Sequence, residues 1–345
     1  MKKNTEKYSG LRFVIPYLGP YKAKITLMFT AMIIIAASTS LLAYMMKPML
    51  NNIFIEKNED MLWILPLIII LLFIVRGVAR YISGYISSYI GVEIVSTLRS
   101  QMFDKAIHAD YNAINSKSTA AITKDIIHML VSLRNIIGKT IPSMLISALT
   151  IIGMIVTILY LNWFLALSAI GFASLLILPI RYLSKSLKKN IMKSENVMAG
   201  MMQRINESFA NIDLVKIHNN EDYEKKLFDK EVENFSKLQM TVTKHKELTS
   251  PVMETFVSIA VAFVVYSGGR SVINDTMSVG DFFAFVTALM LLYAPVKDVT
   301  KNTMVITMLD AYTGGIKKFL SIKQEPLKDQ LLDKPIESIR FENVS

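Results

Sequence analysis

The amino-acid sequence predicts an all-α membrane protein with six transmembrane helices and long cytoplasmic helical extensions. Two observations lead to this prediction. Of the 345 residues, 52% are hydrophobic and only 19% are charged, whereas about a quarter of the residues of a soluble domain are charged. The charged residues are also absent from several runs of 15 to 41 residues, and about 20 apolar residues in a helix cross a bilayer.

Five charge-free runs define the six spans. The first has 22 residues and is long enough by itself, and the second continues its apolar character to residue 90. The third has 41 residues, enough for two helices, and Asn162-Trp163 is a polar, interfacial pair at which it can turn. The runs are residues 25–46, 61–75, 140–180, 255–269 and 282–296.

The Lys and Arg residues predict the orientation of the spans. With six spans both termini lie on one side, and that side holds 35 of the 38 basic residues. Basic residues accumulate on the cytoplasmic side of membrane proteins, so both termini are predicted to be cytoplasmic. The net charge of +10 is therefore interpreted as an orientation signal and not as a nucleic-acid-binding surface.

The two long cytoplasmic connections, residues 76–139 and 181–254, contain few turn signals. Residues 181–250 contain one glycine, Gly200, and no proline, and the next proline in the chain is Pro251. This pattern indicates helices that continue out of the membrane and return, about 30 residues or 45 Å each way. Residues 11–21 combine apolar side chains with basic flanks, which predicts an interfacial elbow helix within a cytoplasmic N-terminal segment, 1–24.

Few residues are candidates for chemistry. Arg76 and Arg80 lie at the end of the second apolar run, where a charge faces a wet interior, finds a partner or snorkels to the headgroups. Lys297 has the same position after the last run, which forms the sixth span. The four histidines are scattered without ligand spacing, and the absence of cysteine excludes disulfides and thiolate metal sites. No catalytic or metal site is predicted.

Several short segments match one known family in their order and spacing. They are Lys47-Pro48-Met49-Leu50, Ile74-Val75-Arg76-Gly77, Tyr81-Ile82-Ser83, Leu98-Arg99, Glu207, Val215-Lys216, Asn219-Asn220-Glu221-Asp222-Tyr223-Glu224, Phe228, Ser278-Val279-Gly280-Asp281, Pro295-Val296-Lys297 and residues 339–345. Together they resemble the transmembrane domain of a bacterial ATP-binding-cassette (ABC) exporter of type 1, and within that family the lipid A flippases. The resemblance covers the chain from about residue 11 to its end.

The resemblance implies a domain organisation and a function. Residues 25–320 would form the six-helix exporter domain, and residues 321–345 a linker and the first strand of a truncated nucleotide-binding domain. The implied activity is ATP-driven flipping of an amphipathic, lipid A-core-like substrate across the bacterial inner membrane by alternating access. ATP and Mg²⁺ would bind in the missing domain and none in this chain, so the full-length homodimer would be the ATP-hydrolysing translocase.

The resemblance also assigns roles to residues. Arg76 and Lys297 match basic positions that bind lipid phosphates, with Arg80 beside them, although Ala294 stands where the flippases have an arginine. Asn219, Asn220 and Glu221 would couple the membrane helices to the ATPase domain, as would the region Asn115 to Ala120. Glycine is usual at the position of Asn219, and asparagine is the residue that best replaces it at positive φ.

Two alternatives remain open at this point. A multidrug or peptide exporter would share every segment quoted above. A stand-alone secondary transporter would use Glu254 at the start of the fifth span for proton coupling, although a helix-end carboxylate also explains this residue. Gly138-Lys139-Thr140 resembles the end of a phosphate-binding loop, but Leu133 occupies the position of its first glycine, so a basic helix flank is predicted there.

Overall fold

The computed structural model describes residues 9–110, 129–175, 177–324 and 340. Within these ranges the chain is helical apart from turns and one isolated bridge between Ala109 and Gln324. The helices are α1 (Ser9–Leu18), η2 (Gly19–Tyr21), α2 (Lys22–Tyr44), α3 (Met46–Pro48), η3 (Met49–Ile55), α4 (Glu59–Ile107), η4 (Ile136–Thr140), α7 (Ile141–Leu161), α8 (Trp163–Leu175), α9 (Ile177–Ala210), α10 (Ile212–Ile217), α11 (Glu221–Ile273) and α12 (Val279–Leu320).

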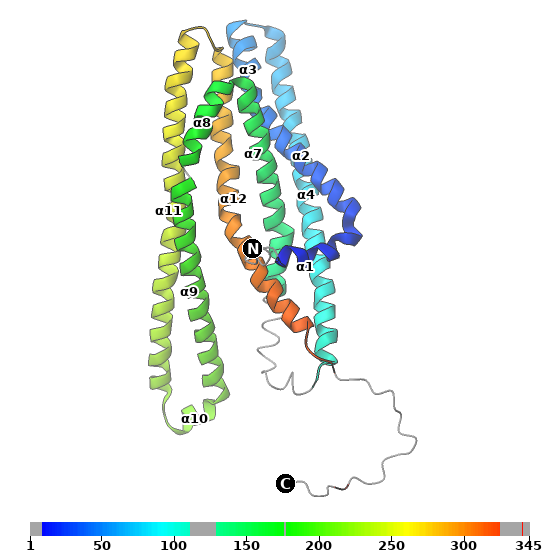
Figure 1. Ribbon diagram of the computed structural model, residues 1–345, viewed down its shortest axis with the longest axis vertical. Coiled ribbons are helices and arrows are strands. Elements are labelled where there is room, and N and C mark those ends of the chain that lie inside the picture. Colours follow the sequence, from blue (N-terminus) through cyan, green and yellow to red (C-terminus); the bar gives the residue numbers. More distant parts are fainter. Residues whose placement is uncertain (1–8, 111–128, 176, 325–339, 341–345) are drawn as a thin grey trace, which may run out of the picture.

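The long helices run roughly side by side along one axis (Figure 1). In the described part of the chain, five helical segments are long and apolar enough to cross a membrane, and they match five predicted spans. They are Gly10–Ile55, Glu59–Ile107, Met129–Leu161, Glu221–Ile273 and Val279–Thr303. The span predicted after Asn162 falls on α8 and α9, which flank residue 176 outside the described ranges. A count of six therefore stays a prediction.

Short turns gather at one end of the bundle, which we call the loop end. It comprises α3, η3, Asn162 and the start of α12. Each turn carries a side-chain cap that satisfies free backbone N–H groups of the next helix. Asn58 accepts from Asp60 and Met61, Asn162 from Phe164 and Leu165, and Ser278 from Asp281. The predicted turn at Asn162-Trp163 is thus confirmed.

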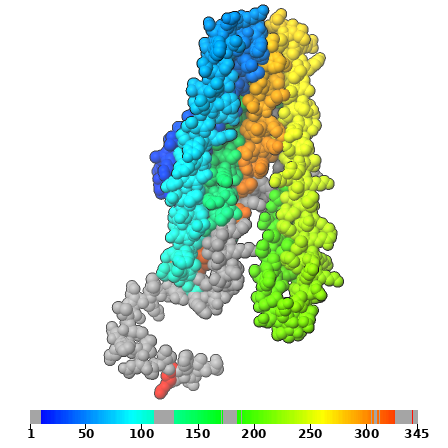
Figure 2. Space-filling view, turned by 180° about the vertical axis from the view of Figure 1, so that it is seen from behind, coloured from blue at the N-terminus to red at the C-terminus, as the bar shows by residue number. Residues whose placement is uncertain are grey.

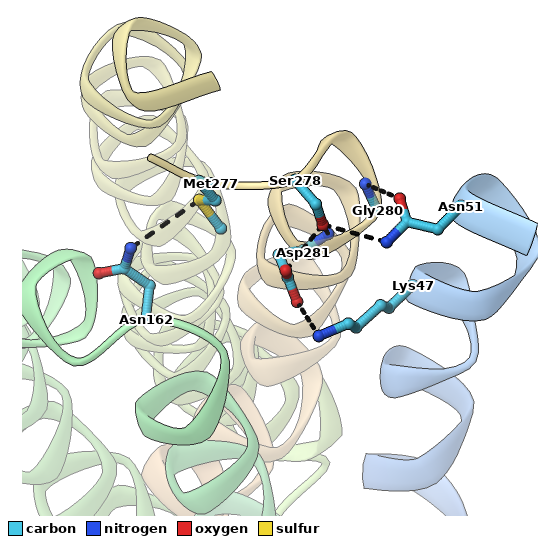
Figure 3. Close-up of polar contacts among 7 residues, drawn as sticks. All are labelled: Lys47, Asn51, Asn162, Met277, Ser278, Gly280 and Asp281. Atoms are coloured by element: carbon cyan, nitrogen blue, oxygen red, sulfur yellow. Dashed lines mark hydrogen bonds and ion pairs between the residues drawn. The ribbon is translucent and has the colours of Figure 1, made fainter. Parts of the chain in front are cut away.

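The loop end is tied together across the sequence by a polar cluster (Figure 3). Lys47 Nζ lies 2.8 Å from Asp281 Oδ1. Asn51 donates to Ser278 Oγ over 3.1 Å and accepts from the backbone N–H of Gly280 over 2.9 Å. A Cβ atom on Gly280 would lie 2.6 Å from the carbonyl oxygen of Lys47, so only glycine permits this approach. These contacts fix the start of α12 against α3 and η3.

The opposite end, which we call the hairpin end, is formed by α9, α10 and α11. The lower parts of α9 and α11 stand apart from α4 in both views (Figures 1 and 2). Arg204 of α9 joins Glu231 of α11 over 2.8 Å, and its second contact reaches Glu224 over 3.5 Å. The out-and-back helical hairpin predicted over residues 181–254 is confirmed, and Pro251 lies within α11 without ending it. The hairpin predicted over residues 76–139 includes residues 111–128, which lie outside the described ranges.

Helix packing near the middle of the bundle depends on small residues. A Cβ on Gly91 of α4 would lie 3.1 Å from the Cα of Gly138 in η4, so the two backbones approach closely there. Much of α4 remains exposed, including Leu67, Leu71 and Ile74, as expected of a surface that faces lipid. The short helix α1 lies crosswise to the long helices (Figure 1), and the N–H of Gly10 donates to Asp310 Oδ1 over 2.7 Å.

Candidate functional site: a polar cavity between the membrane helices

A cavity of about 620 Å³ lies between α2, α4, η4, α7 and α12. Its wall is rich in hydroxyl groups and carries four ionisable side chains, which is unusual at membrane depth. The lining residues are Ile35, Thr39, Arg76, Arg80, Ser83, Gly84, Ser87, Ser88, Gly138, Lys139, Pro142, Ser143, Ile146, Ser147, Thr150, Leu291, Ala294, Pro295 and Asp298. Its volume lies within the range of small-molecule binding sites.

The α4 wall of the cavity follows helical spacing. Arg76, Arg80, Ser83 and Ser87 are separated by four, three and four positions, so they share one face of the helix. The Nε atom of Arg76 is buried and has no hydrogen-bond partner among the described residues. The structure therefore places both predicted arginines on one wall of the cavity.

The α12 wall contributes a carboxylate that the sequence did not single out. Asp298 Oδ2 accepts hydrogen bonds from Ser143 and Ser147 of α7, each over 2.7 Å. Its Oδ1 accepts from the side-chain amide of Asn302 over 2.9 Å. The sequence did contain a signal for a polar partner at this place. The spacing of Ser143, Ser147 and Thr150 puts three hydroxyl groups on one face of an otherwise apolar helix.

Lys297 does not line this cavity, because neighbouring helix positions point about 100° apart. Its Nζ donates to Ser250 Oγ of α11 and lies 5.4 Å from the centre of the Tyr293 ring. Glu254 joins the same group, since it accepts from Tyr293 Oη over 2.9 Å and from Ser250 Oγ over 3.0 Å. Within the one chain, Lys297 and Glu254 thus form a separate polar group between α11 and α12.

An open, mostly apolar groove of about 440 Å³ adjoins this second group. Glu254 and Tyr293 supply its polar end, and Val257, Val261 and Met290 are among its apolar residues. The groove lies between α11 and α12, away from the arginines of α4. The structure therefore separates the sequence-predicted lipid-binding residues into two places.

The predicted coupling residues lie at the tip of the hairpin end. Asn219 has φ 48°, so the prediction that asparagine serves here in place of glycine is confirmed. Asn220 immediately precedes α11, and Glu221 accepts from Lys216 Nζ over 2.9 Å. This hydrogen bond lowers the pKa of Glu221 below its ordinary value. Asn115 and Ala120 lie outside the described residues.

Gly138-Lys139-Thr140 belongs to the π-helical turn η4, which leads directly into α7. Gly138 faces the backbone of α4 at Ser88 and Gly91. A phosphate-binding loop needs exposed glycine amides after a strand, so these residues do not fit a nucleotide. The prediction of a basic helix flank is confirmed.

The chain forms a bundle of long, apolar helices with a polar cavity between them, and comparison with known proteins identifies its class. Residues 25–296 match the model of the ABC transporter transmembrane region. The chain belongs to this family. Membership argues against the stand-alone secondary transporter that the sequence left open.

Three similar proteins carry the same name. The chain is 31% identical to the ATP-dependent lipid A-core flippase of Desulfotalea psychrophila, over 94% of this chain and 58% of that protein. It is 28% identical to the protein of the same name from Syntrophus aciditrophicus, over 94% and 55%. For the flippase of Nitrosococcus oceani the identity is 29%, over 98% and 57%. The chain thus spans a little over half the length of these relatives.

Proposed function

We propose that this chain is the membrane half of an ABC exporter that flips an acidic, lipid-linked glycan of the lipid A-core type across the bacterial inner membrane. The family match and the names of the relatives support the class. The observation that carries the substrate proposal is the pair Arg76 and Arg80 on the cavity face of α4. A guanidinium kept in an apolar helix binds a phosphate well, because its fork matches phosphate oxygens.

The working unit would be a homodimer with two nucleotide-binding domains, each beginning within residues 321–345 of one chain. ATP and Mg²⁺ would bind in those domains and supply the energy for alternating access. Asn219, Asn220 and Glu221, together with the region from Asn115 to Ala120, would contact them. Lys297 of each chain would add a cation where the two chains enclose a shared space.

In this arrangement the hairpin end lies in the cytoplasm, the loop end outside the cell and α1 in the cytoplasmic interface. The distribution of basic residues supports this orientation. The chain has no cysteine, so single cysteines give an unambiguous test. Cysteines at Asn58 and Asn274 should react with an impermeant reagent in intact cells, and one at Asn219 should not. Labelling at Asn219 from outside would overturn both the orientation and the coupling role.

The substrate proposal is tested at Arg76. A hydrogen bond to a charged group contributes roughly 1.5–3 kcal/mol, so Arg76→Ala should weaken binding of a phosphorylated glycolipid about ten- to a hundredfold. Binding of a neutral drug should change little. Arg76→Lys should fall between, because lysine keeps the charge but not the fork. The measurement is equilibrium binding of both ligands to the full-length protein.

A multidrug exporter is the second candidate function, and the cavity supplies the observation that favours it. Ala294 lines the cavity where the flippases have an arginine, and Asp298 adds a negative charge. Equal losses for the glycolipid and the neutral drug in Arg76→Ala would favour this candidate over the lipid flippase.

A further inference from the structure

The cavity between α2, α4, α7 and α12 separates its charges by wall. Arg76 and Arg80 come from α4 and Lys139 from η4, whereas the single carboxylate among the lining residues, Asp298, comes from α12. Among the described residues, none of the three cations forms an ion pair with Asp298. Opposite charges thus line one cavity without neutralising each other in pairs.

Asp298 is held in place by neutral groups. Ser143 and Ser147 both donate to Oδ2, and Asn302 donates to Oδ1. These three donors fix the carboxylate but carry no charge, so its negative charge remains available. A carboxylate accepts about four hydrogen bonds, which leaves about one acceptor position, on Oδ1, for a further donor.

The α4 wall has polar groups without partners. Arg76 Nε is buried and unpartnered within the described part of the chain. The hydroxyl of Ser83, one further residue of that face, is also unpartnered there, and this residue is only 1% exposed. Buried polar groups normally have partners. An anionic group bound beside Arg76 and Arg80 would supply hydrogen-bond acceptors to this wall.

We infer that the cavity binds a zwitterionic headgroup, with a phosphate at Arg76 and Arg80 and a protonated primary amine at Asp298. This inference rests on the proposed function and narrows its substrate class. The carboxylate of Asp298 would repel a ligand that carries only negative charge. The three cations would repel a ligand that carries only positive charge. Phosphoethanolamine carries both charges a few bonds apart, so it offers one charge to each wall.

The test compares two lipids with identical acyl chains in the full-length protein, purified in a neutral maltoside detergent. One is a phosphatidylethanolamine, and the other is its N-acetyl derivative, which keeps the phosphate but loses the ammonium charge. The wild-type protein should bind the first about tenfold more tightly or better, the range expected for one charge-assisted hydrogen bond. This comparison needs no variant, so it holds even where a substitution impairs folding. Equal affinities would overturn the inference.

Asp298→Asn should remove the preference, because it weakens binding of the amine-bearing lipid and leaves the N-acetyl lipid unaffected or tighter. Glu247→Gln is the matched control, since it removes one negative charge from an exposed position on α11. The control should keep the full preference. Equal losses for both lipids in Asp298→Asn would show that the carboxylate acts only through Ser143 and Ser147, and would overturn the inference.

Arg76→Ala separates this inference from the proposed function. It should weaken both lipids equally, because both keep the phosphate. If Arg76→Ala weakens both lipids while the wild type shows no preference between them, the flippase proposal stands and the zwitterion inference fails. Glycerophosphoethanolamine, added as a soluble competitor, identifies the source of the ligand. Displacement of the lipid indicates a site for the headgroup alone, and retention indicates a site for the whole lipid.

Discussion

At the loop end, Asn51 bonds to Ser278, 227 positions away in the sequence, whereas at the hairpin end Arg204 bonds to Glu231, 27 positions away. The first kind of contact joins different parts of the bundle, and the second joins a hairpin to itself. α9 and α11 pack mainly on each other. The loop end is therefore fixed to the rest of the molecule, and the hairpin end is rigid internally while its position is set by few contacts.

The largest effect is expected from Gly280→Ala at the loop end. The added Cβ would lie 2.5 Å from Asn51 Oδ1 and 2.6 Å from the Lys47 carbonyl, so α12 must shift away from α3. Overpacking of this kind costs about 1–3 kcal/mol. Thermal unfolding of the chain in detergent, followed by fluorescence of Trp63 and Trp163, should show a lower midpoint.

Gly269→Ala in α11 is the matched control for Gly280→Ala. A Cβ at Gly269 meets nothing within 4 Å, and alanine in a helix is favoured over glycine by roughly 1 kcal/mol. The thermal unfolding midpoint of this variant should therefore equal or exceed that of the unsubstituted chain. The same loss in both variants would mean that the close contact at the loop end does not fix α12.

A smaller and more local effect is expected from Arg204→Ala at the hairpin end. This change removes the bonds to Glu231 and Glu224, which are partly exposed, so the loss of stability is small. Hydrogen exchange should accelerate around α10 and remain unchanged at the start of α12. Lys237→Ala breaks the exposed ion pair with Glu233 and should accelerate hydrogen exchange less than Arg204→Ala does. Faster exchange at the loop end in Arg204→Ala would contradict the independence of the two ends.

The smallest effect is expected at two left-handed turn residues, of which one is taken from each end. Asn219 has φ 48° and Asp275 has φ 55°, a conformation that costs alanine about 1–2 kcal/mol and asparagine or aspartate less. Each alanine substitution should therefore destabilise its own turn by less than about 1 kcal/mol, and each glycine substitution should be neutral. Local hydrogen exchange at the two turns measures this. Faster hydrogen exchange at the end that does not carry the substitution would show that the two ends are coupled.

The features that the sequence predicted are local. The turn at Asn162, the hairpin between residues 181 and 250 and the left-handed Asn219 each follow from residues close together in the chain. The charge-free runs are also local, because a helix that crosses the hydrocarbon core of a bilayer needs consecutive apolar residues.

The features that the sequence missed join distant residues. The contact of Asp298 with Ser143 spans 155 positions, and the pair of Lys47 and Asp281 joins the two sides of the loop end. Lys297 was grouped with Arg76, yet it points to α11 because one helical position turns a side chain by about 100°. Such contacts depend on how each helix is rotated about its axis, which hydropathy does not determine.

The polar cluster around Asp281 gives α12 the mechanics of a lever. At 1.5 Å per residue its 42 residues measure about 63 Å. With the start of the helix held as a fulcrum, a tilt of about 5° sweeps Leu320 sideways by about 5 Å, over the same rise per residue. Asp310, near the far end of this arm, is hydrogen-bonded to the backbone of α1. A sideways force on α1 is therefore transmitted to α12 far from its fixed start. At this distance a given force exerts a large torque on α12 about that start.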